Sequence, residues 1–87
     1  MRRSRLEIIN DMLKASKNGV KKTHIMYKAK LSFSQLEVYL SFLKERGLIE
    51  NKKDNNGKIR YKTSEKGYKV MKKIDEIENL ITIENSN

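Results

Sequence analysis

Apolar residues recur at intervals of three and four along the first half of the chain, which is the spacing of one helical face. This pattern predicts three helices, over residues 4–17, 22–30 and 33–46. The positions expected to face inward are Leu6, Ile9 and Leu13, then Ile25, Met26 and Ala29, then Phe33, Leu36, Leu40 and Leu43. Three apolar faces so close in sequence favour a small helical core.

Two of these helices begin with a local hydrogen-bonding signal. In the first, Ser4 is followed three residues later by Glu7. In the third, Ser32 is followed three residues later by Gln35. Each pair has the spacing of a capping box, in which the two side chains satisfy free backbone N–H groups. The pairs therefore predict where the first and third helices start.

After Gly47 the period changes from helical to alternating. Apolar and polar residues alternate in 48–53 and again in 58–63, which predicts two short strands. The segment between them, 54–57, reads Asp-Asn-Asn-Gly, and these residues favour a tight turn. An isolated hairpin is only marginally stable, so this one is expected to pack against the helices.

The last helix, predicted over 65–83, carries a coiled-coil stripe. Its apolar residues are Gly67, Val70, Ile74, Ile77 and Ile81, with Met71 and Leu80 beside them. Such a helix is about 28 Å long at 1.5 Å per residue, so its far half is expected to overhang the small body. The stripe from Ile74 to Ile81 would then be exposed in a single chain.

That exposure is costly in water and predicts a homodimer through the last helix. The expected interface is Val70, Met71, Ile74, Ile77, Leu80 and Ile81. Because the stripe spans only about two heptads, Ile8 and Met12 of the first helix are expected to add to it. An antiparallel dimer is favoured over the alternative, a monomer whose last helix packs wholly on its own domain.

The order of elements predicts a mainly α (α+β) fold, a winged helix-turn-helix with a two-stranded wing and a C-terminal coiled-coil helix. Residues 4–63 would form the winged domain and residues 64–84 the dimerisation helix. The short link before Ser32 has the length of a helix-turn-helix turn. The third helix is then the candidate recognition helix, the element that enters the major groove of DNA.

With its leucines inward, the recognition helix would turn Ser34, Val38, Ser41 and Glu45 outward. Ser34 and Gln35 can hydrogen-bond base edges, and Val38 can touch a thymine methyl group. No arginine lies on the leading half of this helix, so modest sequence specificity is expected. Phe42 is expected to fold back under the wing, the alternative being contact with DNA or a partner.

The charge of the chain also favours DNA as the ligand. Residues 1–73 hold all 20 basic residues and seven of the 11 acidic ones, a net charge of +13. A surface this basic suits a polyanion, since each neutralised phosphate releases counterions; the alternative is solubilising charge. The residues predicted to bind double-stranded DNA are Arg3, Lys21, Lys22, Lys28 and Lys30 around the helix-turn-helix, Ser32, Ser34, Gln35 and Val38 on the recognition helix, and Lys53, Asn55, Asn56, Lys58 and Arg60 in the wing. Arg2, Arg3 and Arg5 form either a basic arm or a solvated terminus.

Other function classes find little support. The chain has no cysteine, one histidine (His24) and no recognised acid–base set or phosphate loop, so no enzyme activity, metal, cofactor or small-molecule ligand is predicted. No apolar run suggests a signal peptide or membrane span, and a cytoplasmic, nucleoid-associated protein is expected. The four tyrosines are expected in or near the core rather than in a single-strand stacking platform. Two alternatives remain, a module whose basic face docks an acidic protein and an RNA-binding protein.

Several motifs, in this order, resemble an archaeal winged-helix family typified by the Sulfolobus 10a DNA-binding proteins. They are Lys-Thr-His-Ile-Met-Tyr (22–27), Leu-Ser-Phe (31–33), Gln-Leu (35–36), Tyr-Leu (39–40), Gly-Leu-Ile (47–49) and Thr-Ser-Glu-Lys-Gly (63–67). The likeness runs from about Arg5 to Ile81. It implies architectural or regulatory DNA binding and dimerisation through an antiparallel coiled coil of the last helices. The last helix here is shorter than in that family.

Overall fold

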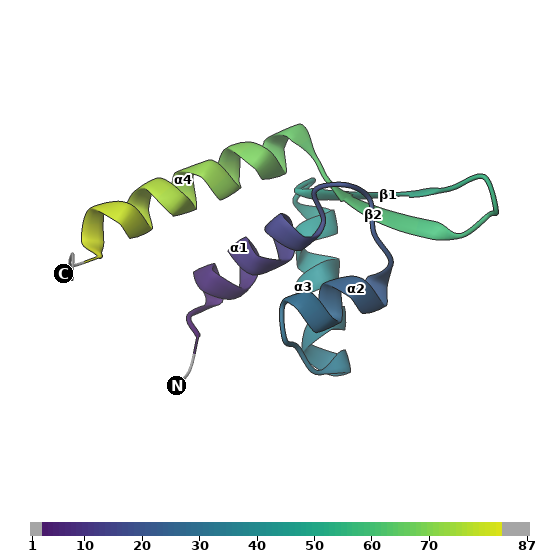
Figure 1. Ribbon diagram of the computed structural model, residues 1–87, viewed down its shortest axis with the longest axis horizontal. Helices are drawn as coiled ribbons and strands as arrows, with labels where there is room; N and C mark the ends of the chain where they lie inside the picture. Colours follow the sequence, from purple (N-terminus) through teal and green to yellow (C-terminus); the bar gives the residue numbers. More distant parts are fainter. Residues whose placement is uncertain (1–2, 83–87) are drawn as a thin grey trace.

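The computed structural model describes residues 3–82. Arg2 of the alternative basic arm and residues 83 and 84 of the predicted dimerisation helix lie outside this range. The elements are α1 (Arg5–Ala15), α2 (Lys22–Lys28), α3 (Phe33–Glu45), β1 (Ile49–Lys53), β2 (Ile59–Thr63) and α4 (Glu65–Ile81) (Figure 1). Each predicted element is present and its ends agree within about two residues, which confirms the winged helix-turn-helix fold.

Both capping boxes form as their spacing predicts. The Ser4 hydroxyl accepts from the Glu7 amide at 3.1 Å, and the Glu7 carboxylate accepts from the Ser4 amide at 2.7 Å. At the start of α3 the Ser32 hydroxyl accepts from the Gln35 amide at 3.2 Å, and the Gln35 carbonyl accepts from the Ser32 amide at 3.0 Å. Gly47, with φ at +72°, lets the chain leave α3 and enter the hairpin.

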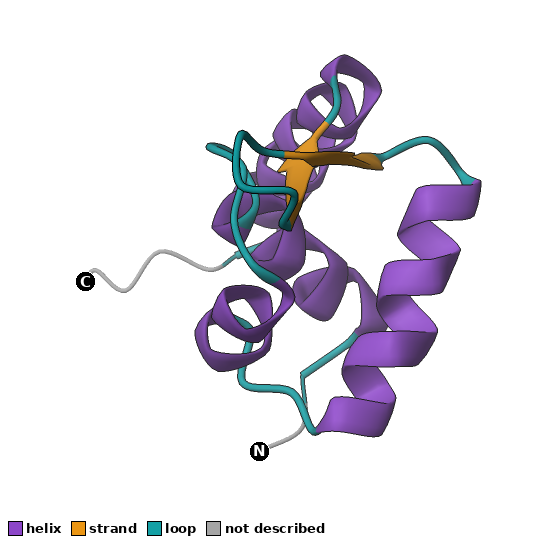
Figure 2. Cartoon of the chain, turned by 90° about the vertical axis from the view of Figure 1, so that its right-hand side faces the viewer, coloured by secondary structure: helices purple, strands orange, loops and turns teal. Residues whose placement is uncertain are grey.

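The core lies where α1, α2, α3 and the base of the wing meet. Met12, Leu13, Ile25 and Leu43 are fully buried there. The first half of α4 lies along α1 and closes one side of this core, while its far end and the start of α1 lie at the end of the molecule opposite the wing (Figure 1). Seen from the wing end, the strands cross above α2 and α3 (Figure 2). The molecule measures 48 × 26 × 22 Å.

Backbone and hydroxyl hydrogen bonds fasten the wing to the helices. Strand β1 pairs antiparallel with β2, with Ile49 opposite Thr63 and Lys53 opposite Ile59. The buried Thr63 hydroxyl donates to the Leu13 carbonyl of α1 at 2.6 Å. Val20 exchanges two backbone hydrogen bonds with Tyr61, of 2.8 and 2.7 Å. The base of the wing is thereby held on the body, and only its tip projects freely.

Several apolar residues lie elsewhere than their spacing predicted. Leu6 and Phe33 were expected to face inward but are 51% and 63% exposed, because each sits at the start of its helix, beyond the edge of the core. Tyr27, expected near the core, is 76% exposed on α2. Phe42 does not fold under the wing; it is 37% exposed, with the Arg46 guanidinium 4.8 Å above its ring.

The stripe of α4 divides into an inner and an outer part. Met71 and Ile74 are 8% and 5% exposed because they pack against the chain's own core, so the expectation that Ile74 is exposed in a single chain is wrong. Ile8 and Met12 are buried in the same core and offer no surface to a partner. The exposed part of the stripe is Ile77, Leu80 and Ile81.

Candidate nucleic-acid interface

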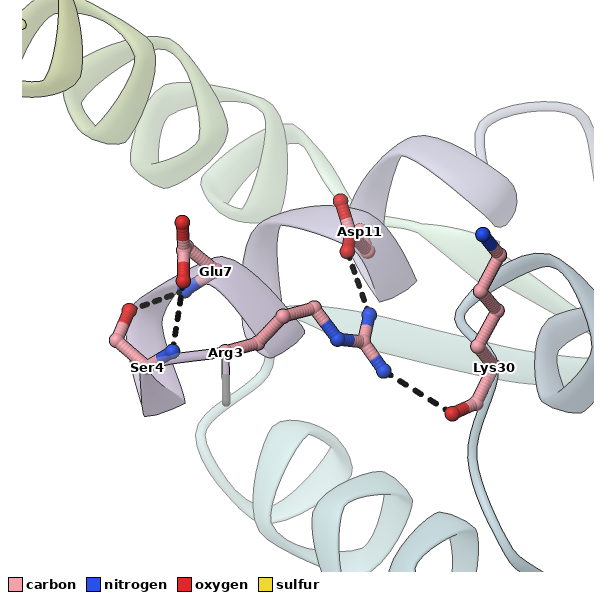
Figure 3. Close-up of polar contacts among 5 residues, drawn as sticks. All are labelled: Arg3, Ser4, Glu7, Asp11 and Lys30. Carbon is pink, nitrogen blue, oxygen red and sulfur yellow. Dashed lines mark hydrogen bonds and ion pairs between the residues drawn. The ribbon is translucent and has the colours of Figure 1, made fainter. Parts of the chain in front are cut away.

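The helix-turn-helix turn connects α2 to α3 through Lys30, whose φ of +55° is unusual for a residue with a side chain. The turn is fixed from outside by Arg3 (Figure 3). The Arg3 guanidinium donates to the Asp11 carboxylate of α1 at 2.7 Å and to the Lys30 carbonyl at 3.0 Å. Arg3 therefore joins α1 to the turn, with two of its five N–H donors engaged within the chain, while the Lys30 side chain remains exposed.

The outer face of α3 is as the helical spacing predicted. Ser34 and Ser41 are exposed, and Val38 is 69% exposed. Gln35 is also exposed, but its side-chain carbonyl accepts the Ser32 amide in the capping box. A bidentate contact to adenine needs both the carbonyl and the NH2 group of a glutamine. In this conformation one of the two lone pairs of the Gln35 carbonyl is already used.

The tip of the wing is organised by Asp54. Its carboxylate accepts the backbone N–H groups of Asn56 and Lys58, each at 2.9 Å, and the Arg60 guanidinium at 3.0 Å. The hydrogen bond from Lys58, followed by that from Arg60, lowers the pKa of Asp54 below its ordinary value. Four other wing residues predicted to bind DNA are exposed, and their side chains make no hydrogen bond with the described residues: Lys53, Asn55, Asn56 and Lys58. Arg60 is half-buried and paired.

On α2 the predicted lysines differ in their surroundings. Lys21 and Lys28 are exposed at the two ends of the helix. Lys22 is half-buried and donates to the Glu37 carboxylate of α3 at 2.8 Å. This hydrogen bond raises the pKa of the Lys22 amine.

Sequence reasoning missed two charged residues on the flank of α3 that faces the wing. Lys44 is exposed, with its amine 5.9 Å from the centre of the Tyr61 ring. Glu37 is the partner of Lys22. The two are seven residues apart, two helical turns on one face, and that spacing could have identified them. Together with Lys22 they line a small pocket between α3 and β2.

A second surface lies at the far end of the molecule from the wing. A groove of about 420 Å³ runs between the start of α1 and the end of α4, lined by Leu6, Glu7, Ile74, Ile77, Glu78 and Ile81 among others. Around it, Ile77 is 50%, Leu80 84% and Ile81 73% exposed. This is an apolar surface open to solvent.

Residues 3–82 also bear on membrane and metal binding. No helix there is long and apolar enough to cross a membrane. The same residues hold no group of three or more histidine, cysteine, aspartate or glutamate side chains placed to bind a metal ion. His24 is exposed on α2 and lines a shallow polar pocket with Asp11, Lys14 and Lys28.

A helix-turn-helix followed by a basic two-stranded wing and a further helix defines a winged helix-turn-helix protein. The sequence agrees, since the pattern of the winged helix-turn-helix family matches residues 2–82. The chain belongs to this family. No curated protein has a sequence significantly similar to that of the chain.

Several solved structures are similar to this chain. Sso10a-2, a DNA-binding protein from Sulfolobus solfataricus, is 26% identical with a TM-score of 0.80, over 90% of this chain and 81% of that one. The transcriptional regulator BldR from the same organism is 18% identical with a TM-score of 0.75, over 91% of this chain and 63% of BldR. PcaV, a transcriptional regulator from Streptomyces coelicolor, shares the fold at 16% identity and a TM-score of 0.65, over 97% of this chain and 65% of PcaV. The resemblance to the Sulfolobus 10a proteins is confirmed.

Proposed function

We propose that this chain is a double-stranded DNA-binding protein, acting as a transcription regulator or architectural nucleoid protein. The observation that carries the proposal is the exposed outer face of α3 beside a wing whose lysines are free. Recognition helices of this kind enter the major groove, while a basic wing reaches the adjacent minor groove. The similarity to Sso10a-2, itself a DNA-binding protein, supports the assignment.

Modest sequence specificity is part of the proposal. Helix α3 contains no arginine; the nearest, Arg46, follows its last residue. The side-chain carbonyl of Gln35 already accepts a hydrogen bond from the Ser32 amide. Specific readout of guanine or adenine relies on such groups. Lys21, Lys28, Lys30, Lys53 and Lys58 instead offer phosphate contacts, which position a protein without reading sequence.

The test is the salt dependence of duplex binding, measured by fluorescence anisotropy with several unrelated sequences. The wild type should lose affinity steeply with salt, by about 0.9 in log–log slope for each phosphate contacted. The double variant Lys53→Gln/Lys58→Gln should bind every sequence more weakly, with a slope shallower by nearly 2. The matched control is Lys69→Gln/Lys72→Gln, which removes the same charge from exposed positions on α4.

Equal losses of duplex affinity in both double variants would mean that only total charge matters. The wing would then not be part of the binding surface. No binding to any duplex would contradict the function itself. A stable complex with an acidic protein in that case would favour the interaction module. A preference for duplex RNA over duplex DNA would favour an RNA-binding protein.

We also propose that two chains pair through the outer part of the α4 stripe, Ile77, Leu80 and Ile81, with Leu6 of α1 at its edge. Surfaces of this apolar character are rare on monomers and mark association sites. Sedimentation of Ile77→Asp should show dissociation at concentrations where the wild type is a dimer. Asn79→Asp adds the same charge on the opposite face of α4 and should leave the dimer intact. A monomeric wild type, or an unaffected Ile77→Asp dimer, would contradict this interface.

A further inference from the structure

A small pocket lies where the N-terminal end of α2, the flank of α3 and strand β2 meet. Its volume is about 150 Å³, and it is lined by Lys22, Glu37, Leu40, Ser41, Lys44 and Tyr61. Leu40 and Tyr61 are buried and form its apolar base. The other four bring two amines, a hydroxyl and one carboxylate to its rim. Such a rim suits a small, singly charged anionic group.

The charges around this pocket are unequally engaged. The Lys22 amine donates to the Glu37 carboxylate at 2.8 Å, with the two side chains 37% and 44% exposed. Lys44 makes no ion pair with any of the residues the structure describes, and its amine lies over the Tyr61 ring. One lysine is thus neutralised by a carboxylate, while the other remains available.

The position of the pocket indicates what would approach it. If α3 lies in the major groove and the wing reaches the minor groove, one DNA strand crosses between them. The phosphates of that strand pass the space between α3 and β2, where this pocket opens. Lysine amines and serine hydroxyls are common phosphate donors.

We propose that this pocket binds one backbone phosphate of duplex DNA, and that Glu37 holds Lys22 in its place until DNA arrives. The proposal rests on the DNA-binding function proposed above. On binding, Lys22 exchanges the Glu37 carboxylate for the phosphate, which Lys44 and the Ser41 hydroxyl also contact. A lysine amine is charged at neutral pH with either partner, so the exchange needs no proton transfer.

Glu37 then limits affinity in two ways. It competes with the phosphate for Lys22, and its own charge repels the phosphate across a short distance. Its removal should strengthen binding more than removal of an exposed carboxylate from the wing. Glu50 on β1 provides that comparison, since it is exposed and forms no ion pair among the described residues.

The experiment measures duplex affinity across salt for the wild type, Glu37→Gln, Glu50→Gln and Lys44→Gln. Both glutamate variants raise the net charge by one. Glu37→Gln should bind duplex DNA about tenfold more tightly than the wild type. The affinity of Glu50→Gln should stay within about twofold of the wild-type affinity. Lys44→Gln should bind more weakly, with a salt slope shallower by about 0.9, the loss of one phosphate contact. Thermal unfolding of each variant checks that these exposed or half-exposed changes leave the fold intact.

Equal affinities for Glu37→Gln and Glu50→Gln would overturn the exchange at Lys22. An unchanged salt slope in Lys44→Gln would overturn the phosphate pocket. In both cases salt-dependent binding by the wild type would leave the DNA-binding function standing. Absence of duplex binding by the wild type and every variant would overturn that function and this inference together.

Discussion

Gly67, in the first turn of α4, lies where that helix passes the end of α3 and the base of the wing. A Cβ atom at this position would lie 2.7 Å from the Thr63 Cγ2 atom and closer still to the Leu48 carbonyl oxygen. That carbonyl cannot move freely, because it accepts the Ser64 amide at 3.0 Å. The Ser64 hydroxyl in turn donates to the Gly47 carbonyl at 2.6 Å. The clash is therefore with fixed backbone.

Gly67→Ala sets two effects of opposite sign against each other. Alanine is favoured over glycine in a helix by about 1 kcal/mol. Forcing a methyl group into a packed site costs about 1–3 kcal/mol, and the upper end applies where backbone must shift. The free energy of unfolding should therefore fall by about 2 kcal/mol, which for a domain of this size lowers the melting temperature by roughly 8–16 °C.

Thermal unfolding followed by circular dichroism, at one protein concentration for all variants, measures this shift. Lys69→Ala, at an exposed position on the same helix, is the control and should change stability by less than about 0.5 kcal/mol. A melting temperature equal to or above that of the wild type for Gly67→Ala would refute the packing argument. It would show that α4 can lift from the wing base without cost.

Three further predictions concern the core, the wing and Arg3. Leu13→Ala, at a fully buried position, should lower the free energy of unfolding measured in urea by about 2–5 kcal/mol, a large part of the stability of so small a domain. Because the pKa of Asp54 is lowered in the fold, its contribution is complete above its unfolded value near 3.9 and is lost as the pH falls through the folded value. The stability advantage of the wild type over Asp54→Asn should thus shrink below about pH 4 in pH-dependent melting, and a constant difference would contradict it. Arg3→Ala should leave the salt slope of DNA binding unchanged, since the guanidinium holds Asp11 and Lys30; a slope shallower by about 0.9 would make Arg3 a phosphate contact instead.

Most of the secondary structure was readable from the sequence because its signals are local. A capping box needs only residues three apart, as Ser32 and Gln35 are, and a helical stripe needs only a repeat. The hairpin likewise followed from alternation around the turn at 54–57. These patterns, in their order, were enough to predict the winged fold.

The engagement of charged side chains was not readable in this way. Arg3 bonds the Lys30 carbonyl, 27 residues away, and Lys22 pairs with Glu37 on the next helix. A net charge of +9 counts all such lysines and arginines alike. Only the packing of α1, α2 and α3 shows which cations are free for phosphate and which already have a carboxylate or carbonyl.

The sequence by itself determined the elements, their order and the basic character of the surface, because each depends on residues near one another in the chain. Tertiary structure decided which part of each apolar stripe is core. Met71 and Ile74 are buried in the chain's own core, whereas Ile77 and Ile81 line the open groove that separates the end of α4 from the start of α1. Periodicity fixes the face of a helix, but the distance to the neighbouring helix fixes where that face stops being covered.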